Sequence, residues 1–265
     1  MSNIRMVAVD MDGTFCRPDL TFDVPRFQAL LAKMKAAGCH FVVASGNQYF
    51  QLRDFFPGYW QELTFVAENG AYVREADEVI FCGQFAPDVV DATLDWIEAD
   101  PQVKTILSCE DMAYMQRGTS EEYFRIMQKY YHHLSWADDL RTVGVPVLKF
   151  ALNVPSDQTW EYVRRFRTEL PAGVEPTSSG HGEIDLIVPG CHKASGLQRL
   201  ADRWGIAPEE CVAFGDGGND IEMLRWAGIG YAMENASDEV KAAADRVCSS
   251  NADDGVLVAL EELFA

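Results

Sequence analysis

The chain has 265 residues, 48% of them hydrophobic, so it can bury a core of its own as one large domain or two moderate ones. With 41 acidic and 22 basic residues, its formal charge of −19 argues against nucleic acid and anionic membranes as partners. No apolar run approaches the ~18 residues of a membrane span, and the N-terminus lacks the apolar segment of a signal peptide. We therefore expect a soluble, cytoplasmic protein.

Seven cysteines are scattered along the chain, and no two are closer than 20 positions. This spacing fits neither a zinc knuckle nor a redox pair. An odd, scattered set favours buried thiols in a reducing cytosol.

The first predicted strand, residues 4–10, ends beside two aspartates, Asp10 and Asp12. Side chains two positions apart in an extended strand point to the same face, so the two carboxylates are expected to converge. Like charges placed together cost energy unless something neutralises them. The alternative is an ordinary Asp-Gly turn in which Asp12 caps the loop.

A helix is predicted to follow, with Pro25 in its first turn and Gly38 at its end. Its apolar residues share one face and are Phe27, Leu30, Leu31 and Met34. With the strand at 39–45, this helix forms a right-handed strand–helix–strand unit.

The second strand ends in Ser45, Gly46 and Asn47. A hydroxyl group and closely spaced backbone N–H groups at the start of a helix form an arrangement that cradles an anion. A simple serine N-cap is the alternative interpretation.

Further strands are predicted at 63–68, before an Asn69-Gly70 hairpin signal, and at 210–216 and 228–233. Alternating strands and helices indicate a parallel sheet with both faces covered.

The segment 84–189 has a different pattern, which we interpret as an inserted α+β domain. Its predicted helices and strands lie at 87–99, 104–108, 121–131, 147–154, 158–167 and 183–188. Residues 1–83 and 190–265 then form the core domain.

Lys193 opens the helix after this insertion, where a cation is unfavourable for the helix dipole. Most single lysines are solvated surface residues, but a buried anionic ligand would explain this position.

The strand at 210–216 runs into GDGGND, which supplies Asp216, Asn219 and Asp220. Such hard oxygen ligands suit Mg²⁺. An EF-hand is excluded because the twelfth position from Asp10 is Thr21 and the sixth from Asp216 lacks glycine. The chain also has no P-loop motif.

The order of these motifs, strand–DxDGT, strand–SG, lysine and strand–GDGGND, resembles the haloacid dehalogenase-like (HAD) phosphatases. Within them, the sequence is similar to the Cof-like sugar phosphatases of enterobacteria. The resemblance spans essentially the whole chain and includes all four motifs. It implies a Rossmann-like parallel α/β core, the HAD fold, with the inserted α+β domain acting as a cap.

The resemblance also implies a mechanism. Asp10 would be the nucleophile that forms an aspartyl-phosphate, and Asp12 the general acid and base. Mg²⁺ would be held by Asp10, the main-chain carbonyl of Asp12 and Asp216. Asp220 would orient Lys193 or a metal-bound water.

The phosphate group would be bound by four residues, which are Ser45, Gly46, Lys193 and Asn219. Two groups in the insertion are candidates for contacting the organic part of the substrate. A plain alternating strand explains the first group equally well, and it consists of His181, Glu183 and Asp185. Aromatics on a helix surface that pack against a neighbour are the simpler explanation of the second group, which is His132, His133 and Trp136.

The predicted function is Mg²⁺-dependent hydrolysis of a small phosphorylated metabolite, a sugar phosphate, by a monomer or small homo-oligomer. A phosphosugar mutase of the same superfamily is the related alternative. From other classes, a phospho-receiver is disfavoured because its phosphoacceptor lies on a later strand, and a binding module without turnover is disfavoured because every expected catalytic position is filled.

Overall fold

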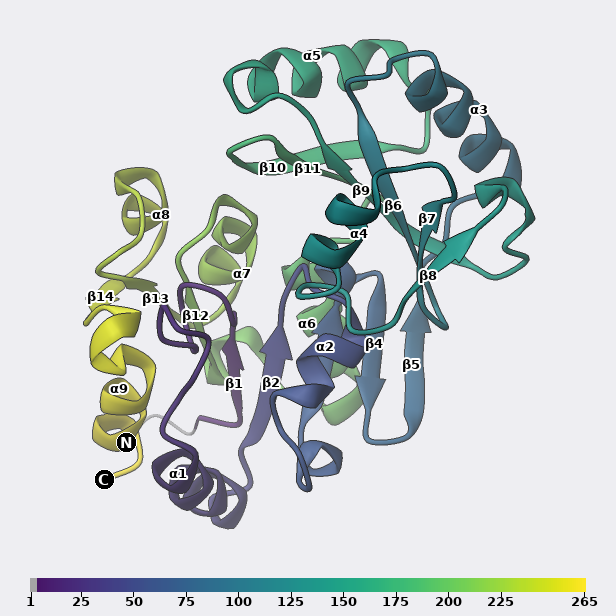
Figure 1. The fold of residues 1–265 in the computed structure, drawn as a ribbon. Coiled ribbons are helices and arrows are strands. Elements are labelled where there is room, and N and C mark those ends of the chain that lie inside the picture. Colours follow the sequence, from purple (N-terminus) through teal and green to yellow (C-terminus); the bar gives the residue numbers. More distant parts are fainter. Residues whose placement is uncertain (1–3) are drawn as a thin grey trace.

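The computed structural model describes residues 4–265 and contains two separate β-sheets (Figure 1). The larger sheet has eight strands. Its order is β14 (Arg246–Cys248), β13 (Ile229–Met233), β12 (Cys211–Gly215), β1 (Met6–Val9), β2 (His40–Ala44), β3 (Thr64–Ala67), β4 (Tyr72–Glu75) and β5 (Glu78–Cys82). All neighbours from β14 to β3 are parallel, and β4 and β5 add an antiparallel edge.

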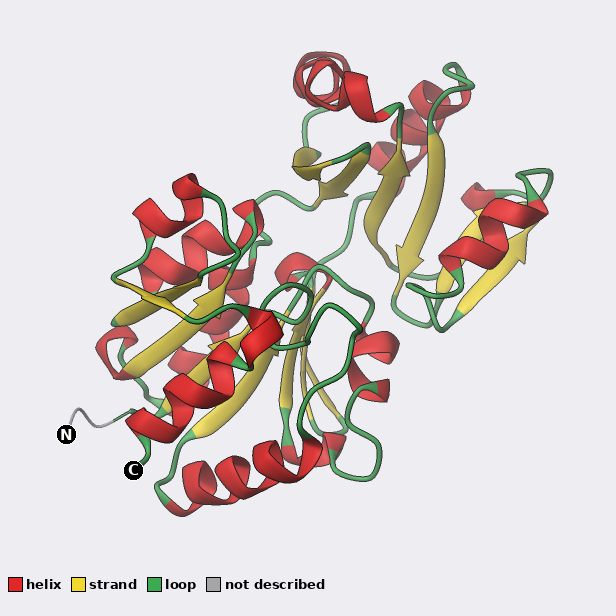
Figure 2. Ribbon diagram, turned by 60° about the vertical axis from the view of Figure 1, so that its left-hand side comes forward, coloured by secondary structure: helices red, strands yellow, loops and turns green. Residues whose placement is uncertain are grey.

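Helices cover both faces of this sheet, as a buried parallel sheet requires (Figure 2). One face packs against α1 (Val24–Ala36), α2 (Tyr49–Asp54) and α9 (Gly255–Leu263). The other packs against α6 (Lys193–Trp204), α7 (Ile221–Trp226) and α8 (Asp238–Ala243). Successive residues of β1 alternate between the two cores, so all four are buried.

The predicted helix after the first strand is confirmed as α1. The side chain of Asp23 caps it by accepting a bond from the Arg26 amide, and Pro25 lies in the first turn. All four residues of the predicted apolar face are buried. Gly38 follows the helix with φ of +72°, a conformation that glycine adopts without strain.

The smaller sheet has six strands, all within residues 104–187. Its order is β10 (Glu175–Gly180), β11 (Glu183–Ile187), β9 (Val147–Asn153), β6 (Lys104–Cys109), β7 (Ala113–Gln116) and β8 (Leu134–Ala137). Helices α3 (Pro87–Glu98) and α5 (Thr159–Glu169) pack on one face, and α4 (Glu121–Met127) lies on the side nearer the larger sheet (Figure 1). The predicted combination of a parallel α/β core and an inserted α+β unit is confirmed.

We keep 84–189 as the proposed extent of the cap, with 1–83 and 190–265 as the proposed core; residues 1–3 of that range lie outside the described residues. Below, "cap" and "core" mean these two segments.

Several details differ from the prediction. Strands β5 and β14 of the larger sheet and β7, β8 and β10 of the smaller sheet were not predicted. Helix α4 ends at Met127, earlier than predicted, where the amides of Lys129 and Tyr130 bond to carbonyls only three residues back, those of Ile126 and Met127. Short 3₁₀ turns lie at Trp60–Glu62, Glu68–Gly70, Leu140–Thr142, Ser156–Gln158, Pro208–Glu210, Gly218–Asp220 and Asn251–Asp253. Within residues 4–265, no helix has the length and apolar character needed to cross a bilayer.

Candidate active site

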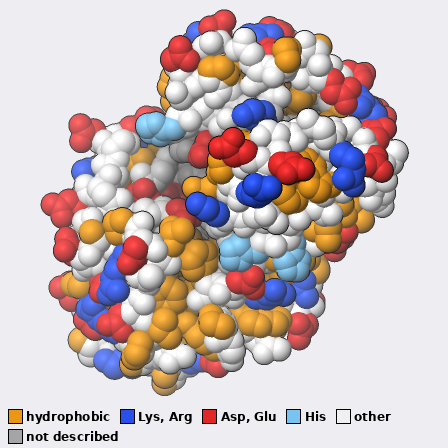
Figure 3. Space-filling model, viewed as in Figure 1, with side chains coloured by type: hydrophobic (Ala, Val, Ile, Leu, Met, Phe, Trp, Pro, Cys, Tyr) orange, Lys and Arg blue, Asp and Glu red, His pale blue; other side chains and the backbone are white. Residues whose placement is uncertain are grey.

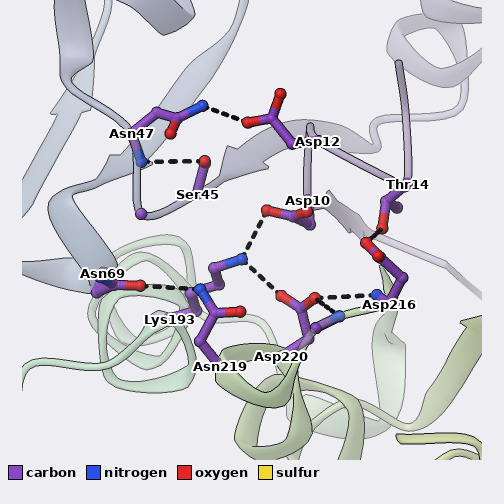
Figure 4. Close-up of polar contacts among 12 residues, drawn as sticks. Asp10, Asp12, Thr14, Ser45, Asn47, Asn69, Lys193, Asp216, Asn219 and Asp220 are labelled. Atoms are coloured by element: carbon purple, nitrogen blue, oxygen red, sulfur yellow. Dashed lines mark hydrogen bonds and ion pairs between the residues drawn. The ribbon is translucent and has the colours of Figure 1, made fainter. Parts of the chain in front are cut away.

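Three neighbouring strands bring their C-terminal ends to one edge of the larger sheet. Strand β1 pairs in parallel with β2 on one side and with β12 on the other. The residues that follow these strands include Asp10, Ser45 and Asp216, and all three line one cavity of about 550 Å³. Figure 3 shows a hollow between the two parts of the molecule, and Figure 4 shows the side chains converging within the site.

Three carboxylates form a cluster that could hold a metal ion. Asp10, Asp216 and Asp220 each offer an oxygen, and these oxygens lie within 4.8 Å of one another. Both oxygens of Asp220 already accept bonds, one from Lys193 and the other from the backbone amides of residues 216 and 217. Asp10 and Asp216 are therefore better placed than Asp220 to coordinate a cation.

Lys193 is the first residue of α6 and is 1% exposed. Its Nζ lies 2.6 Å from an oxygen of Asp10 and 2.6 Å from one of Asp220 (Figure 4). Burial alone would lower the pKa of Lys193, but these two carboxylates raise it above its ordinary value. The position of Lys193 at a helix N-terminus is therefore explained by two carboxylates of the chain itself, Asp10 and Asp220, which neutralise its charge.

The carboxylates of the cluster are perturbed by their surroundings. Burial raises the pKa of Asp216 to about 6, assisted by Asp220 and opposed by the bond that Thr14 Oγ1 donates at 2.6 Å. Burial, Asp220 and Asp216 likewise raise the pKa of Asp10 well above its ordinary value, although Lys193 acts in the opposite direction. A divalent cation would reverse this effect, because it favours the ionised form of each ligand. The donor set therefore fits a hard divalent metal.

Asp12 lines the same cavity as Asp10, so the predicted convergence of the two side chains on one site is observed. Their environments differ, because Asp10 is buried and Asp12 is exposed. Asp12 accepts a hydrogen bond from the side-chain amide of Asn47 (Figure 4). The exposed carboxyl group can exchange protons with solvent.

The loop of residues 45–47, named here the phosphate loop after its predicted role, joins β2 to α2. Its residues line the cavity, and the backbone amide of Asn47 donates to Ser45 Oγ at 3.1 Å. Helix α2 begins only at Tyr49, so the loop precedes the helix instead of forming its first turn. Its N–H groups therefore belong to irregular backbone held by tertiary contacts.

Asn219 also lines the cavity, and its Nδ2 donates to Asn69 Oδ1 at 3.1 Å. Asn69 belongs to the hairpin that the Asn-Gly signal predicted between β3 and β4. Six of the eight predicted site residues therefore line the cavity, and the other two are hydrogen-bonded beneath it. Lys193 and Asp220 are the supporting pair beneath it.

The candidate residues of the cap separate into two groups. Strand β11 alternates, so Ile184 and Leu186 enter the cap core while Glu183 and Asp185 line the cavity. The alternating strand is therefore observed, and contact of Glu183 and Asp185 with the substrate stays a prediction that their place on the cavity wall permits. His181 is not among the cavity-lining residues.

The aromatic group of the cap packs against neighbours. Trp136 stacks on Phe124 with ring centroids 4.2 Å apart, and His133 stacks on Phe50 at 4.0 Å. His132 pairs with Asp54 at 2.9 Å. The packing interpretation is therefore the one observed, although these residues lie on or before β8, not on a helix. The cavity takes its aromatic wall from other residues, which are Tyr123, Tyr130 and Tyr131.

Thr14 and Lys149 are also among the residues of the site that were not predicted. Thr14 positions Asp216, and its signal was its place in the DxDGT motif. Lys149 lines the cavity from the cap, and its signal was a single charged residue in the mostly apolar strand β9. Sequence alone gave no partner for it.

Residues 7–260 match the haloacid dehalogenase-like hydrolase family. The chain is 40% identical over 262 residues to the 5-amino-6-(5-phospho-D-ribitylamino)uracil phosphatase YbjI of Escherichia coli (strain K12), covering 99% of this chain and 97% of that protein. It is 29% identical to the phosphatase YitU of Bacillus subtilis (strain 168), named for the same substrate, over 98% of this chain and 97% of that one. The crystal structure of SMU.1108c from Streptococcus mutans UA159 superposes with a TM-score of 0.93 at 34% identity, covering 98% of both chains.

Proposed function

The chain belongs to the haloacid dehalogenase-like hydrolases and is a phosphatase, and from this premise we propose that it hydrolyses small sugar phosphates with Mg²⁺ through an aspartyl-phosphate at Asp10. The observation that carries the proposal is the meeting of Asp10, Asp216, Lys193 and Ser45 at one edge of the core sheet. Such a cluster can bind and react with an anionic group, although the negative net charge of the whole protein would repel that group.

In this mechanism Asp10 attacks the phosphorus atom and the ester oxygen leaves, so that one difficult hydrolysis becomes two displacements. Asp12 gives a proton to the departing alkoxide and later accepts one from the attacking water. Its exposed position and its bond from Asn47 support this role, because the carboxyl group is held at the cavity wall yet open to solvent.

Mg²⁺ would be held by the carboxylates of Asp10 and Asp216 and by the main-chain carbonyl of Asp12, and it would neutralise charge on the phosphoryl oxygens. The carboxylate cluster and the raised pKa values support this assignment. Asp220 would orient Lys193 and the backbone of the Asp216 loop, as its hydrogen bonds indicate.

The phosphate group would receive hydrogen bonds from Ser45, the Gly46 amide, Lys193 and Asn219. These groups supply positive charge and N–H dipoles where charge develops in the transition state. Three of the four line the cavity, and Lys193 reaches it through its bond to Asp10.

The cap would recognise the organic part of the substrate. The tyrosine wall offers flat apolar faces, and Asn153 and Glu183 offer hydrogen-bonding groups. By similarity to its 40% relative, the first candidate substrate is 5-amino-6-(5-phospho-D-ribitylamino)uracil, a phosphorylated polyol chain attached to a flat ring. Hexose, pentose and tetrose phosphates are the other candidates.

All seven cysteines are free thiols, which suits a reducing compartment. We therefore propose a cytoplasmic location, and separately we propose that the protein is a monomer or a small homo-oligomer.

The experiment that tests this function is phosphate release from a panel of these esters, with Mg²⁺ and with a chelator, by the wild type and Asp10→Asn. Asp91→Asn, an exposed aspartate of α3, is the matched control. We expect Asp10→Asn to lose on the order of 10⁴-fold in kcat. Activity that survives either Asp10→Asn or removal of the metal would refute the mechanism, and a panel without sugar phosphates among its best substrates would refute the substrate class.

A further inference from the structure

Lys149 lies in the cap, yet its ammonium group contacts the core. The residue is 2% exposed. Its Nζ lies 2.5 Å from the Gly46 carbonyl oxygen, 3.0 Å from Oε2 of Glu68 and 3.3 Å from Oδ2 of Asp185. The Gly46 contact is a hydrogen bond, and the two carboxylates form ion pairs with the ammonium group. Lys149 is therefore a bridge between core and cap.

Its core partner Glu68 is held in an unusual conformation. Glu68 is 1% exposed and has φ of +50°, where a non-glycine residue persists only if its surroundings fix it. Its amide donates to the Asn47 carbonyl at 3.1 Å, and its Oε1 accepts a bond from Ser108 at 2.6 Å. Ser108 lies opposite Lys149 in the β6–β9 register. Two neighbouring cap residues thus hold one buried carboxylate of the core.

The contact with Gly46 reaches the phosphate loop through the geometry of the peptide group. In a trans peptide the carbonyl and the following N–H point in opposite directions. When Lys149 holds the Gly46 carbonyl, it also fixes the direction of the Asn47 N–H, which donates to Ser45 Oγ at 3.1 Å. The next peptide back is fixed similarly, because the Asn69 amide donates to the Ser45 carbonyl at 3.1 Å.

The charges at this bridge favour contact between cap and core. Burial alone would lower the pKa of Lys149, but Asp185 and Glu68 raise it well above its ordinary value. Separating the domains would take Glu68 away from Lys149, whose other carboxylate partner Asp185 belongs to the cap. Leaving the buried Glu68 without its cation is costly unless water replaces it. Asp185 adds a second link, because its Oδ2 accepts a bond from Asn69 Nδ2 at 2.9 Å.

Resting on the proposed function, we propose that Lys149 is a positioning residue that makes the geometry of the phosphate loop depend on closure of the cap. With the cap in place, Lys149 holds the Gly46–Asn47 peptide and, through it, the Ser45 hydroxyl. When the cap moves away to admit substrate or release product, this restraint is lost and the loop binds phosphate more weakly. Phosphate affinity and turnover therefore increase together as the cap closes.

The test must separate this role from simple stabilisation. Lys149→Met removes the bridge but leaves Glu68 buried and charged, so it is compared with the double variant Lys149→Met, Glu68→Gln. The matched control is His132→Asn, which removes the cap–core contact to Asp54 at the exposed rim, away from the phosphate loop. For each protein we would measure the melting temperature, kcat and KM, and the binding of inorganic phosphate in Mg²⁺ by titration calorimetry.

We expect the single variant to melt earlier and the double variant to recover much of that loss, because a buried amide needs no counter-ion. Both should bind phosphate on the order of 10-fold more weakly and lose about 10- to 100-fold in kcat. His132→Asn should match the wild type in phosphate binding and in kcat. A stable double variant with wild-type phosphate affinity and kcat would overturn the proposal.

The phosphate titration also separates this inference from the proposed function. If the wild type hydrolyses no ester of the panel, the proposed function fails. Weakened phosphate binding in the double variant would then still support the role of Lys149, and unchanged binding would overturn it. A wild type that binds no phosphate would overturn both.

Discussion

Lys193 and Asp220 form a buried ion pair in which the two charged atoms lie 2.6 Å apart. Lys193 comes from the start of α6, and Asp220 from the loop that follows β12. The second oxygen of Asp220 accepts the backbone amides of Asp216 and Gly217 at 3.0 and 2.8 Å. The Asp220 carboxylate thus holds both the ammonium group of Lys193 and the loop that carries Asp216, a proposed metal ligand.

Replacing Asp220 with Asn should loosen both contacts, because an amide that accepts from the loop must turn its NH₂ group toward Lys193. We expect Mg²⁺ affinity and kcat to fall by about 10- to 100-fold, and the free energy of unfolding by about 3–5 kcal/mol. Asp202→Asn, an exposed carboxylate bonded to Gln198, is the control. Metal titration, initial rates and urea unfolding would check the prediction, which fails if Asp220→Asn behaves like the control.

Asp12→Asn should separate the two halves of the reaction. The first displacement still yields product when the leaving group is good, but the asparagine cannot accept a proton from water in the second. With 4-nitrophenyl phosphate we expect one burst of product, then slow turnover and a protein heavier by one phosphoryl group. Because Asp12 is exposed, the free energy of unfolding should change by only about 0.5 kcal/mol. Rapid-quench kinetics and intact mass spectrometry would show it, and steady turnover without a phosphorylated species would contradict it.

Mg²⁺ binding should weaken as the pH falls through about 6, the pKa to which burial raises Asp216. Below that pH the carboxyl group holds a proton that the metal must displace, so the apparent dissociation constant should rise about 10-fold per pH unit. Asp10 is shifted in the same direction. Calorimetric titrations between pH 5 and 8 would measure this, and Asp216→Asn should bind weakly with a shallower pH dependence. A dissociation constant independent of pH would be the contrary result.

The same shift affects the stability of the metal-free protein. The folded pKa of Asp216 is above its ordinary value of 3.8, so the folded state binds the proton more tightly than the unfolded chain does. The stabilising contribution of this proton is complete below about pH 3.8 and is lost as the pH rises through about 6. Saturating Mg²⁺ should stabilise the protein most above pH 6, where the cluster is ionised. Melting temperatures with and without Mg²⁺ across this range would check the sign.

Gly13→Ala should disrupt the metal site by direct collision. Gly13 has φ of +81°, and a Cβ there would lie 2.3 Å from Oδ2 of Asp216. Gly38 is the matched control, because its φ is +72° but a Cβ would meet nothing within 4 Å. Both alanine variants should lose about 1–2 kcal/mol from the unfavourable backbone. Only Gly13→Ala should also lose Mg²⁺ affinity and at least about 10-fold in kcat, and equal activities in the two variants would disprove this account.

Much of the core fold could be predicted because short sequence patterns indicate its strands and helices. Apolar runs with polar ends gave the strands β1, β2, β3, β12 and β13, and the face of α1 followed from the helical spacing of its buried residues. Strands β5 and β14 were missed. They lie at opposite edges of the core sheet, where half-exposed residues give a weaker apolar signal.

The polar residues at the strand ends were also recoverable. In a parallel sheet the C-terminal ends of the strands meet at one edge. Residues far apart in the chain, such as Asp10 and Asp216, therefore come together there, and the local pattern of each strand is enough to predict it. What could not be predicted was the difference between Asp10 and Asp12. Their burial depends on how Lys193, Asp216 and Asp220 pack around the first of them.

By itself, the sequence determined the parallel α/β core, the existence of an insertion and the identity of the residues at the strand ends, because each is written in a short window of spacing and polarity. Only the tertiary structure decided that Lys149 of the cap holds Glu68 and the Gly46 carbonyl of the core. The physical reason is that a buried ion needs partners wherever they lie in space, and the docking of one sheet over another is fixed by packing between surfaces, which no local pattern encodes.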